Sequence, residues 1–485
     1  MKTKVVIHYL GLVVTILGLL MLLPLAWSLY HRESDFLAFA ISAGITAGAG
    51  LLLWKLVPGG EGDLTRREGL ALVTGAWILA SVFGALPYEL AGTFRSYLDA
   101  CFEAMSGFTT TGATVLTSIE SQPQSILLWR NFTQWLGGMG IVTFFVALFP
   151  ILGIGAAHLF EAEMPGPQPE RLGARVRDTA RTLWWLYLGL SALEIALLWL
   201  VGRIPMFDAL TITFGTMPTG GFLPKDMSIG AYNSSIFITS AVTFFMVVAG
   251  VNFALYYYLL WKRQPGHLLN NPEFRFYIAI LVGASLLITL DLVRSAGQAV
   301  GEAFRQATFQ AVSIQTTTGF TTANFAAWPS FSQSVLLVLM IIGASAGSTG
   351  GALKVVRVLV LVKHAFREVV LTFSPRSVIP LKIGGNALPE SVVSGIVGTS
   401  ILYFATLIIG FLAMSAMGLD HITALSSVAA TLGNVGPGLG SVGPAGNYFF
   451  LPPLGKIILM LCMLVGRLEF FTVLVLLSPA FWQWR

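Results

Sequence analysis

Charged residues are scarce in this sequence. Asp, Glu, Lys and Arg together make up 11% of the 485 residues, whereas hydrophobic residues make up 55%. Soluble domains usually carry roughly 25% charged residues, and the mean hydropathy of this chain is strongly positive. The composition excludes an ordinary soluble protein and indicates a chain that lies mostly in a lipid bilayer.

Several chemical motifs are also missing. The two cysteines, Cys101 and Cys462, are far apart and imply no disulfide framework. The sequence has no phosphate-binding P-loop, kinase motif set or dinucleotide-binding glycine motif, and its six histidines form no metal-binding spacing. No apolar segment carries the arginine ladder of a voltage sensor, and none contains a catalytic pair. We therefore expect no enzyme, no organic cofactor and no nucleotide binding by this chain alone.

Long apolar runs recur along the chain. Each is long enough, at about 18 residues or more, to cross about 30 Å of hydrocarbon. The first follows Lys2 and Lys4 but lacks a small-residue cleavage site, so we expect a retained helix and not a signal peptide. The expected spans are 5–30, 36–57, 69–91, 124–150, 182–203, 233–261, 275–293, 333–363, 390–418 and 454–480.

Basic residues predict the orientation of these spans. With the N-terminus inside, the inner segments hold 19 Lys and Arg residues and the outer segments seven, which is the positive-inside pattern. Both termini are then cytoplasmic, and the net charge of +5 reflects topology and contact with lipid, not nucleic-acid binding.

Four short turns rich in threonine and glycine interrupt the apolar runs. All four open on the outer side, and their central glycines lie roughly 100 residues apart, as in an internal repeat. Glycine permits positive φ, so each turn can direct backbone carbonyl oxygens at a shared axis, as in a cation selectivity filter. The turns are Thr109-Thr110-Thr111-Gly112-Ala113, Pro218-Thr219-Gly220-Gly221-Phe222, Thr316-Thr317-Thr318-Gly319-Phe320 and Asn434-Val435-Gly436-Pro437.

Moderately apolar stretches too short to cross the membrane precede the turns. Two of them align without a gap, since Phe102-Glu103-Ala104-Met105-Ser106 precedes Gly112 as Phe309-Gln310-Ala311-Val312-Ser313 precedes Gly319. We expect half-helices that enter from outside, with the partly negative C-terminal ends facing a cation. Ordinary extracellular loops with turn glycines are the alternative. Acidic residues near the starts, expected to cap the free N–H groups, are Asp99, Asp208, Glu302 and Asp420.

These features predict an all-α membrane protein built from four helix–pore-helix–helix repeats around one pore. Two extra helices precede the first repeat. The expected units are 1–62 for the two N-terminal helices, then 63–165, 166–265, 266–382 and 383–485 for repeats one to four.

The sequence resembles the bacterial potassium-uptake superfamily that includes TrkH, TrkG and KtrB. The resemblance covers nearly the whole chain and is closest to the TrkH/TrkG branch, because KtrB lacks the two extra helices. It implies potassium uptake, a homodimer, and control by a cytosolic nucleotide-binding ring of the TrkA type. The motifs that carry it are SGFTTTGAT, MPTGGF, QTTTGFTT, GNVGPGLG, GASAGSTGGALK and VGRLEFF.

The filter is expected to be less regular than that of ordinary potassium channels. No TVGYG run is present and the four loops are unequal, so we expect one firm site flanked by weaker ones, with rubidium accepted and sodium partly excluded. The hydroxyls of Thr110, Thr111, Thr317 and Thr318 either ligate the ion or brace the loops. Potassium ligands are expected at Thr111, Gly112, Thr219, Gly220, Thr318, Gly319, Val435 and Gly436, with Asn434 beside them.

A gate is expected inside the third repeat. Four glycines in the segment 343–351 cost roughly 1 kcal/mol each in a helix, so the helix should break there into a loop below the filter. The alternative is a close helix contact made of small residues. We expect such a break in this repeat and not in the inner helices of the other three. The gate residues are expected to be Gly343, Gly347, Ser348, Thr349, Gly350 and Gly351.

Arg467 lies near the middle of the last span, where a charge is costly. We expect it to face the pore below the filter, repel cations there and hold the gate loop; a structural ion pair is the alternative. Glu469 lies on another helix face and is a poor partner. Lys456, nearer the outer end, is expected to extend to the membrane surface.

From the sequence we predict that the protein is a channel-like potassium permease. The alternative is a proton- or sodium-coupled potassium symporter, since broken helices also occur in such transporters. Basic inner segments at 151–181, 262–275 and 364–389 are expected to meet the cytosolic regulator or lipid.

Overall fold

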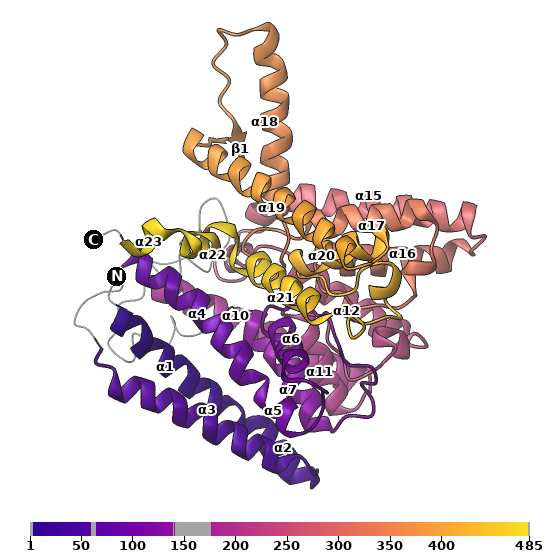
Figure 1. Ribbon diagram of the computed structural model, residues 1–485. Coiled ribbons are helices and arrows are strands. Elements are labelled where there is room, and N and C mark those ends of the chain that lie inside the picture. Colours follow the sequence, from indigo (N-terminus) through magenta and orange to yellow (C-terminus); the bar gives the residue numbers. More distant parts are fainter. Residues whose placement is uncertain (1–2, 60–64, 139, 141–175, 484–485) are drawn as a thin grey trace.

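The computed structural model describes residues 3–59, 65–138, 140 and 176–483. Helices dominate this part of the chain (Figure 1). Its only strands are β1 (Lys382–Ile383) and β2 (Asn386–Ala387), which pair antiparallel in a small hairpin. The all-α class expected from the sequence is confirmed.

The N-terminal helices pack at very short range. They are α1 (Thr3–Leu20), α2 (Leu22–His31) and α3 (Phe36–Leu56). A Cβ atom on Gly18 would lie 2.5 Å from the backbone nitrogen of Ala47, and one on Gly50 would lie 2.4 Å from that of Thr15. Small residues therefore let α1 and α3 approach backbone to backbone, as membrane helices commonly do.

The rest of the chain repeats one pattern four times: an outer helix, a shorter pore helix, a loop and an inner helix. The first repeat holds α4 (Arg66–Gly84), α5 (Leu86–Leu90), the pore helix α6 (Tyr97–Phe108) and the inner helix α7 (Gln124–Gly138). The second holds α10 (Val176–Ala196), η2 (Leu197–Val201), the pore helix α11 (Met206–Thr216), η3 (Ser228–Tyr232), and the inner helices α12 (Ile236–Ala249) and α13 (Phe253–Leu260), followed by α14 (Pro265–Leu269).

The third and fourth repeats follow the same order. The third holds α15 (Pro272–Ser295), the pore helix α16 (Val300–Gln315), η4 (Phe325–Ala327), and the inner helices α17 (Ser330–Ile342) and α18 (Val355–Phe373). The fourth holds α19 (Glu390–Ala416), the pore helix α20 (His421–Leu432), η5 (Gly440–Val442), and the inner helices α21 (Pro453–Leu468) and α22 (Phe470–Leu477), followed by α23 (Pro479–Gln483).

The repeats form a closed ring. Each inner helix packs against the pore helix of the next repeat: α7 against α11, α12 against α16, and α17 against α20. The fourth inner helix, α21, packs against α6 of the first repeat. This cyclic pattern confirms the pseudo-symmetric arrangement expected from the sequence.

Fewer helices span a bilayer unbroken than the ten expected runs suggest. Within the described residues, six helices are long and apolar enough to cross a membrane, or seven if the bent pair α12–α13 counts as one span. The other expected spans are interrupted, or, for 124–150, continue outside the described residues after α7.

Broken inner helices are not confined to the third repeat, so that expectation was wrong. The chain bends by 98° between α12 and α13, at Gly250–Asn252. In the fourth repeat, Glu469 has a φ of 65° and separates α21 from α22. The structure shows the local cause in the second repeat: the Ala254 N–H donates to the Asn252 side chain, which caps α13 and starts a new helix there.

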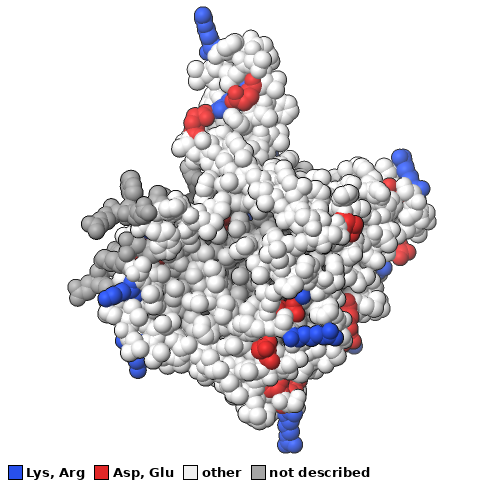
Figure 2. Space-filling model, viewed as in Figure 1, with Lys and Arg blue, Asp and Glu red and all other residues white. Residues whose placement is uncertain are grey.

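Charged side chains occupy the edges of the molecule. In Figure 2 the central belt of this face is almost free of Lys, Arg, Asp and Glu, which gather near the tip of α18 and around the opposite rim. In Figure 1, α18 and the β1–β2 hairpin project away from the helical body. The apolar belt is the surface that a bilayer would cover.

Candidate functional site

The four loops share one backbone conformation. After each pore helix comes a residue in the left-handed region, then one without positive φ, then a glycine with positive φ. The left-handed residues are Thr110, Thr219, Thr317 and Asn434, with φ of 54°, 56°, 61° and 52°. The glycines are Gly112, Gly221, Gly319 and Gly436, with φ of 79°, 84°, 77° and 97°.

Hydrogen bonds at the helix ends produce this conformation. The N–H of the residue after each left-handed residue bonds a carbonyl five residues back, an arrangement that ends many helices. Threonine is a costly residue there, since a left-handed backbone disfavours a branched Cβ. The bonds are Thr111 to Ser106 (2.8 Å), Gly220 to Gly215 (2.8 Å), Thr318 to Ser313 (2.9 Å) and Val435 to Ala430 (2.7 Å).

The register expected for the second loop was wrong by one residue. The sequence alignment placed Gly220 opposite Gly112, but the dihedral angles place Gly221 there. Gly220 instead corresponds to Thr111, Thr318 and Val435. Because the two glycines are consecutive, a sequence alignment can place either of them opposite Gly112. The backbone φ angles identify Gly221 as the equivalent residue.

The loops contact one another in a closed circle. A Cβ atom on Gly112 would lie 2.2 Å from the Gly220 carbonyl oxygen, and one on Gly221 would lie 2.2 Å from that of Thr318. A Cβ on Gly319 would lie 2.0 Å from the Val435 oxygen. The circle closes where a Cβ on Gly436 would lie 2.6 Å from the Thr111 oxygen. The four loops therefore converge, and each glycine is required for space as well as for φ.

Most loop carbonyls are left without a protein donor. In the described part of the chain, no hydrogen bond reaches the carbonyl oxygens of Thr110, Thr219, Thr317 and Asn434. The next residue of each loop, and then the positive-φ glycine, give two further sets of four carbonyl oxygens, and one oxygen in each set accepts a hydrogen bond. Gly220 accepts from Gln134 Nε2 (2.6 Å), and Gly436 accepts from the Tyr448 hydroxyl (2.8 Å). Buried carbonyls without donors are the groups that can bind a dehydrated cation.

The threonine hydroxyls bond other protein groups. Thr111 shares a hydrogen bond with Thr109 and also accepts from Asn434 Nδ2, at 2.8 and 2.9 Å. Thr318 pairs with Thr316 at 2.8 Å. Thr317 accepts from the Gly351 N–H and Thr110 from Arg467. These contacts favour the bracing role over the ligand role that the sequence left open.

Three polar residues on α7 also brace the loops, and sequence reasoning missed them. Gln134 bonds the Gly220 oxygen and the Phe222 N–H. Asn131 donates to the Thr211 and Phe222 oxygens. Arg130 forms a buried ion pair with Glu103. The signal was present, since three polar side chains within five residues of an apolar run require buried partners.

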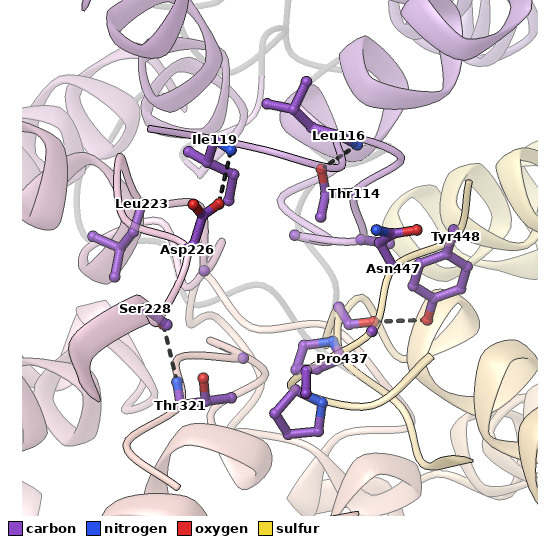
Figure 3. A pocket seen from close by; sticks show the side chains of 18 of the residues that line it. Thr114, Leu116, Ile119, Leu223, Asp226, Ser228, Thr321, Pro437, Asn447 and Tyr448 are labelled. Carbon is purple, nitrogen blue, oxygen red and sulfur yellow. Dashed lines mark hydrogen bonds between the residues drawn. The ribbon is translucent and has the colours of Figure 1, made fainter. Parts of the chain in front are cut away.

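The circle of loops opens into a cavity of about 210 Å³ (Figure 3). All four positive-φ glycines line it. Loops from different repeats bond around it: the Ile119 N–H donates to Asp226 at 2.7 Å, and the Thr321 N–H donates to Ser228 at 3.1 Å. The mouth is therefore built jointly by the repeats.

The glycine-rich segment of the third repeat is a loop between α17 and α18. Its first residue, Gly343, ends α17 with a φ of 72°. Thr349 Oγ1 donates to the Met217 carbonyl at 3.1 Å, and a Cβ on Gly350 would lie 3.0 Å from the Thr316 carbonyl. These carbonyls belong to the residues at the ends of α11 and α16, just before two of the glycine loops. Residues 343–351 therefore lie directly beside the circle of loops, next to the C-terminal ends of these pore helices.

The same loop is held from the second repeat. The Phe253 N–H donates to the Gly347 carbonyl at 3.0 Å, and a Cβ on Gly347 would lie 2.7 Å from the Asn252 side chain. Ser348 closes a turn by donating to the Ser345 carbonyl at 2.6 Å. The loop thus fits into the break between α12 and α13.

Arg467 connects the loop to two repeats. Its guanidinium donates to the carbonyls of Thr349 (2.6 Å), Gly137 (2.6 Å) and Gly138 (2.8 Å), and reaches the Thr110 hydroxyl at 3.3 Å. Glu469 instead pairs with Arg357 of α18 at 2.5 Å. The expected contact between Arg467 and the loop carbonyls is present, and Glu469 has another basic partner.

Two expectations were wrong: that Lys456 extends to the membrane surface, and that an acidic residue caps each of the four pore helices. Lys456 is 6% exposed and pairs with Asp99 of α6 at 2.5 Å. Burial is tolerated because the opposite charge is at hydrogen-bond distance. Of the four acids, Asp420 is an N-cap, and its bond from Thr423 holds the Asp420 pKa below its usual value. The N-caps of α6, α11 and α16 are Ser96, Pro205 and Ala299.

The fold and this site define a class of protein: a membrane transport protein with four pore-helix repeats. Comparison with known sequences agrees, because residues 49–484 match the family model of TrkH, described as a cation transport protein. The chain belongs to the TrkH family. The family consists of transport proteins, which confirms that this chain is not an enzyme.

Full-length relatives are similar throughout. The Trk system potassium uptake protein TrkH of Halomonas elongata is 37% identical, and that of Escherichia coli K12 is 38% identical, with 100% of both chains covered in each case. TrkG of Escherichia coli K12 is 32% identical over 99% of each chain. The crystal structure of the potassium transporter TrkH from Vibrio parahaemolyticus covers 100% of both chains at 36% identity, with a TM-score of 0.89. The expected TrkH/TrkG resemblance is confirmed.

Proposed function

We propose that this chain is the potassium-conducting transmembrane subunit of a Trk potassium uptake system. The observation that carries the proposal is the closed circle of four glycine loops, most of whose carbonyls accept no hydrogen bond from the described residues. Relatives named as Trk potassium uptake proteins cover the full chain, which supports potassium as the transported substrate. The four pore helices end at the circle, so their partly negative ends favour a cation there.

The row formed by Thr110, Thr219, Thr317 and Asn434 offers four donor-free carbonyls and is the firmest site in this proposal. The next two rows each have one carbonyl engaged with a side chain. They are Thr111, Gly220, Thr318 and Val435, and then Gly112, Gly221, Gly319 and Gly436. Gly221 therefore joins the proposed ligand set.

Selectivity tests this proposal. Purified protein in liposomes should conduct potassium and rubidium similarly and sodium less, because incomplete carbonyl rings discriminate only modestly. The measurement is the reversal potential under bi-ionic conditions. Equal permeability of sodium and potassium would contradict the proposed filter.

The loop at residues 343–351 acts as the gate in this proposal. It lies against two filter loops and is tied to Arg467, so it blocks the path until it moves. We expect deletion of two residues within Ser345–Ser348 to raise basal potassium flux several-fold, because the shortened loop loses its fit in the α12–α13 break. Flux is measured as rubidium-86 uptake into liposomes without the regulator. A deletion of equal length in the exposed 384–385 turn is the control, because that turn lies far from the loop in the sequence and its proposed role is regulator docking alone. Unchanged flux after the gate deletion would argue against a gate.

The proposed partners of this chain are those that its similarity to Trk proteins suggests. We propose a homodimer in the bacterial inner membrane, with both termini cytoplasmic, regulated by a TrkA-type nucleotide-binding ring. Segments 262–275 and 364–389 are the described parts of the docking surface; most of 151–181 lies outside the described residues. Arg367 of α18 pairs with Glu390 at the start of α19, at 2.5 Å.

A coupled symporter is the second candidate. The breaks between α12 and α13 and between α21 and α22 favour it, since discontinuous helices occur in such transporters. However, the four repeats run in the same sense, whereas many transporter repeats are inverted. A reversal potential that shifts with an imposed proton or sodium gradient would favour the symporter.

A further inference from the structure

Arg130 of α7 is a buried arginine at the mouth of the proposed pore. Its side chain is 2% exposed, yet it lines the cavity that contains the four loop glycines. Arginine keeps its charge in proteins. A positive charge therefore lies beside the route by which a cation would reach the filter.

Glu103 of α6 lies directly against this arginine. The carboxyl is fully buried, and its Oε1 lies 2.6 Å from Arg130 Nε. The Thr114 hydroxyl bonds both carboxyl oxygens, at 2.8 and 3.0 Å, and the Val115 N–H donates to Oε2 at 3.0 Å. Both groups follow Gly112, so Glu103 also fixes the outer limb of the first loop.

Arg130 extends the connection to the second loop. Its Nη1 donates to the Leu223 carbonyl at 3.1 Å, and its guanidinium lies over the Phe222 ring, 3.6 Å from the centroid. Both residues follow Gly221. The ion pair therefore joins the outer limbs of two filter loops.

The third repeat shows what the carboxyl charge is needed for. Gln310 takes the place of Glu103, and its amide donates to the Thr322 hydroxyl at 3.3 Å. The inner helix of that repeat, Ser330–Ile342, carries no charged residue. A neutral amide thus suffices to brace a loop where no arginine lines the mouth, and the acid occurs where one does.

We propose that Glu103 is the counter-ion that cancels the charge of Arg130 at the pore mouth, and so sets the potassium affinity of the entrance. This inference rests on the proposed function. Removing the carboxylate charge while keeping its shape would leave Arg130 buried and positive beside the approaching ion. Removing both charges would return the mouth to the net charge it has with the intact ion pair, since Lys225 and Asp226 of the same cavity are unchanged.

The test is a double-mutant cycle in liposomes, read as the KM and kcat of rubidium-86 uptake. Glu103→Gln should raise KM about tenfold or more, since an uncancelled charge a few ångströms away acts strongly in a partly buried site. Arg130→Gln combined with Glu103→Gln should return KM to within about threefold of the unmodified protein. The decrease in KM produced by the second substitution is a readout that a purely structural pair would not give.

Glu89→Gln is the matched control, because Glu89 is an exposed acid at the outer end of the same repeat. Equal KM in Glu103→Gln and the unmodified protein would overturn the inference. So would a double variant that is worse than the single one. If Glu103→Gln fails to fold, the double variant Glu103→Arg with Arg130→Glu, which exchanges the two charges, is tested instead. Retained potassium affinity in that variant would support charge cancellation, and loss of affinity would overturn the inference. Absence of potassium uptake by the unmodified protein would instead contradict the proposed function.

Discussion

Gly319→Ala is expected to lower potassium uptake about a hundredfold or more. The new Cβ would lie 2.0 Å from the Val435 carbonyl oxygen and 2.8 Å from Pro437, far inside contact distance. The left-handed φ of 77° adds about 1–2 kcal/mol of strain for a residue with a Cβ. Since about 1.4 kcal/mol corresponds to a tenfold change, the strain and the displaced fourth loop together account for a large loss.

The measurement is rubidium-86 uptake into liposomes at matched protein content. Gly301→Ala is the control, because Gly301 lies in α16 of the same repeat and a Cβ there would contact nothing within 4 Å. It should retain full uptake. Retention of uptake and selectivity by Gly319→Ala would show that the third loop does not border the ion path.

Arg467→Ala is expected to raise basal potassium flux about tenfold. The substitution removes charge-assisted hydrogen bonds to the carbonyls of Thr349, Gly137 and Gly138. Hydrogen bonds to a charged group contribute about 1.5–3 kcal/mol each, so the proposed gate loop loses a bond to Arg467 of the fourth repeat, and Arg467 no longer links it to Gly137 and Gly138 of the first repeat. A positive charge is also removed from below the filter.

Single-channel recording of the purified protein measures this effect as open probability and conductance. Arg467→Lys separates the two causes, because lysine keeps the charge but lacks the planar fork that reaches several oxygens at once. We expect it to raise open probability and leave conductance nearly unchanged. Equal flux in Arg467→Ala and the unmodified protein would assign Arg467 a structural role only.

The sequence predicted the architecture well, because the signals were long and repeated. Apolar runs predicted the outer helices, and the gap-free alignment before Gly112 and Gly319 predicted matching pore helices, which α6 and α16 confirm. The break at Gly343 was also predictable, since a run of glycines opposes a helix on its own.

Other features were hidden because they depend on contacts between distant segments. The break before Phe253 contains a single glycine; there the Asn252 side chain caps α13 and also packs against Gly347 of the third repeat. Lys456 was expected at the surface because its partner Asp99 lies 357 residues away in the sequence. The register of Gly220 and Gly221 depends on which of the two glycines takes a positive φ, and the hydrogen bond from the Gly220 N–H to the Gly215 carbonyl accompanies the choice of Gly221.

The seam between the first and last repeats has a consequence for biogenesis. The contacts that complete the circle, Lys456 with Asp99 and Asn434 with Thr111, join residues 357 and 323 positions apart. Such distant contacts form late during folding. A chain that ends before the fourth repeat lacks these contacts, so we expect the circle of loops to close only after the last repeat has been made.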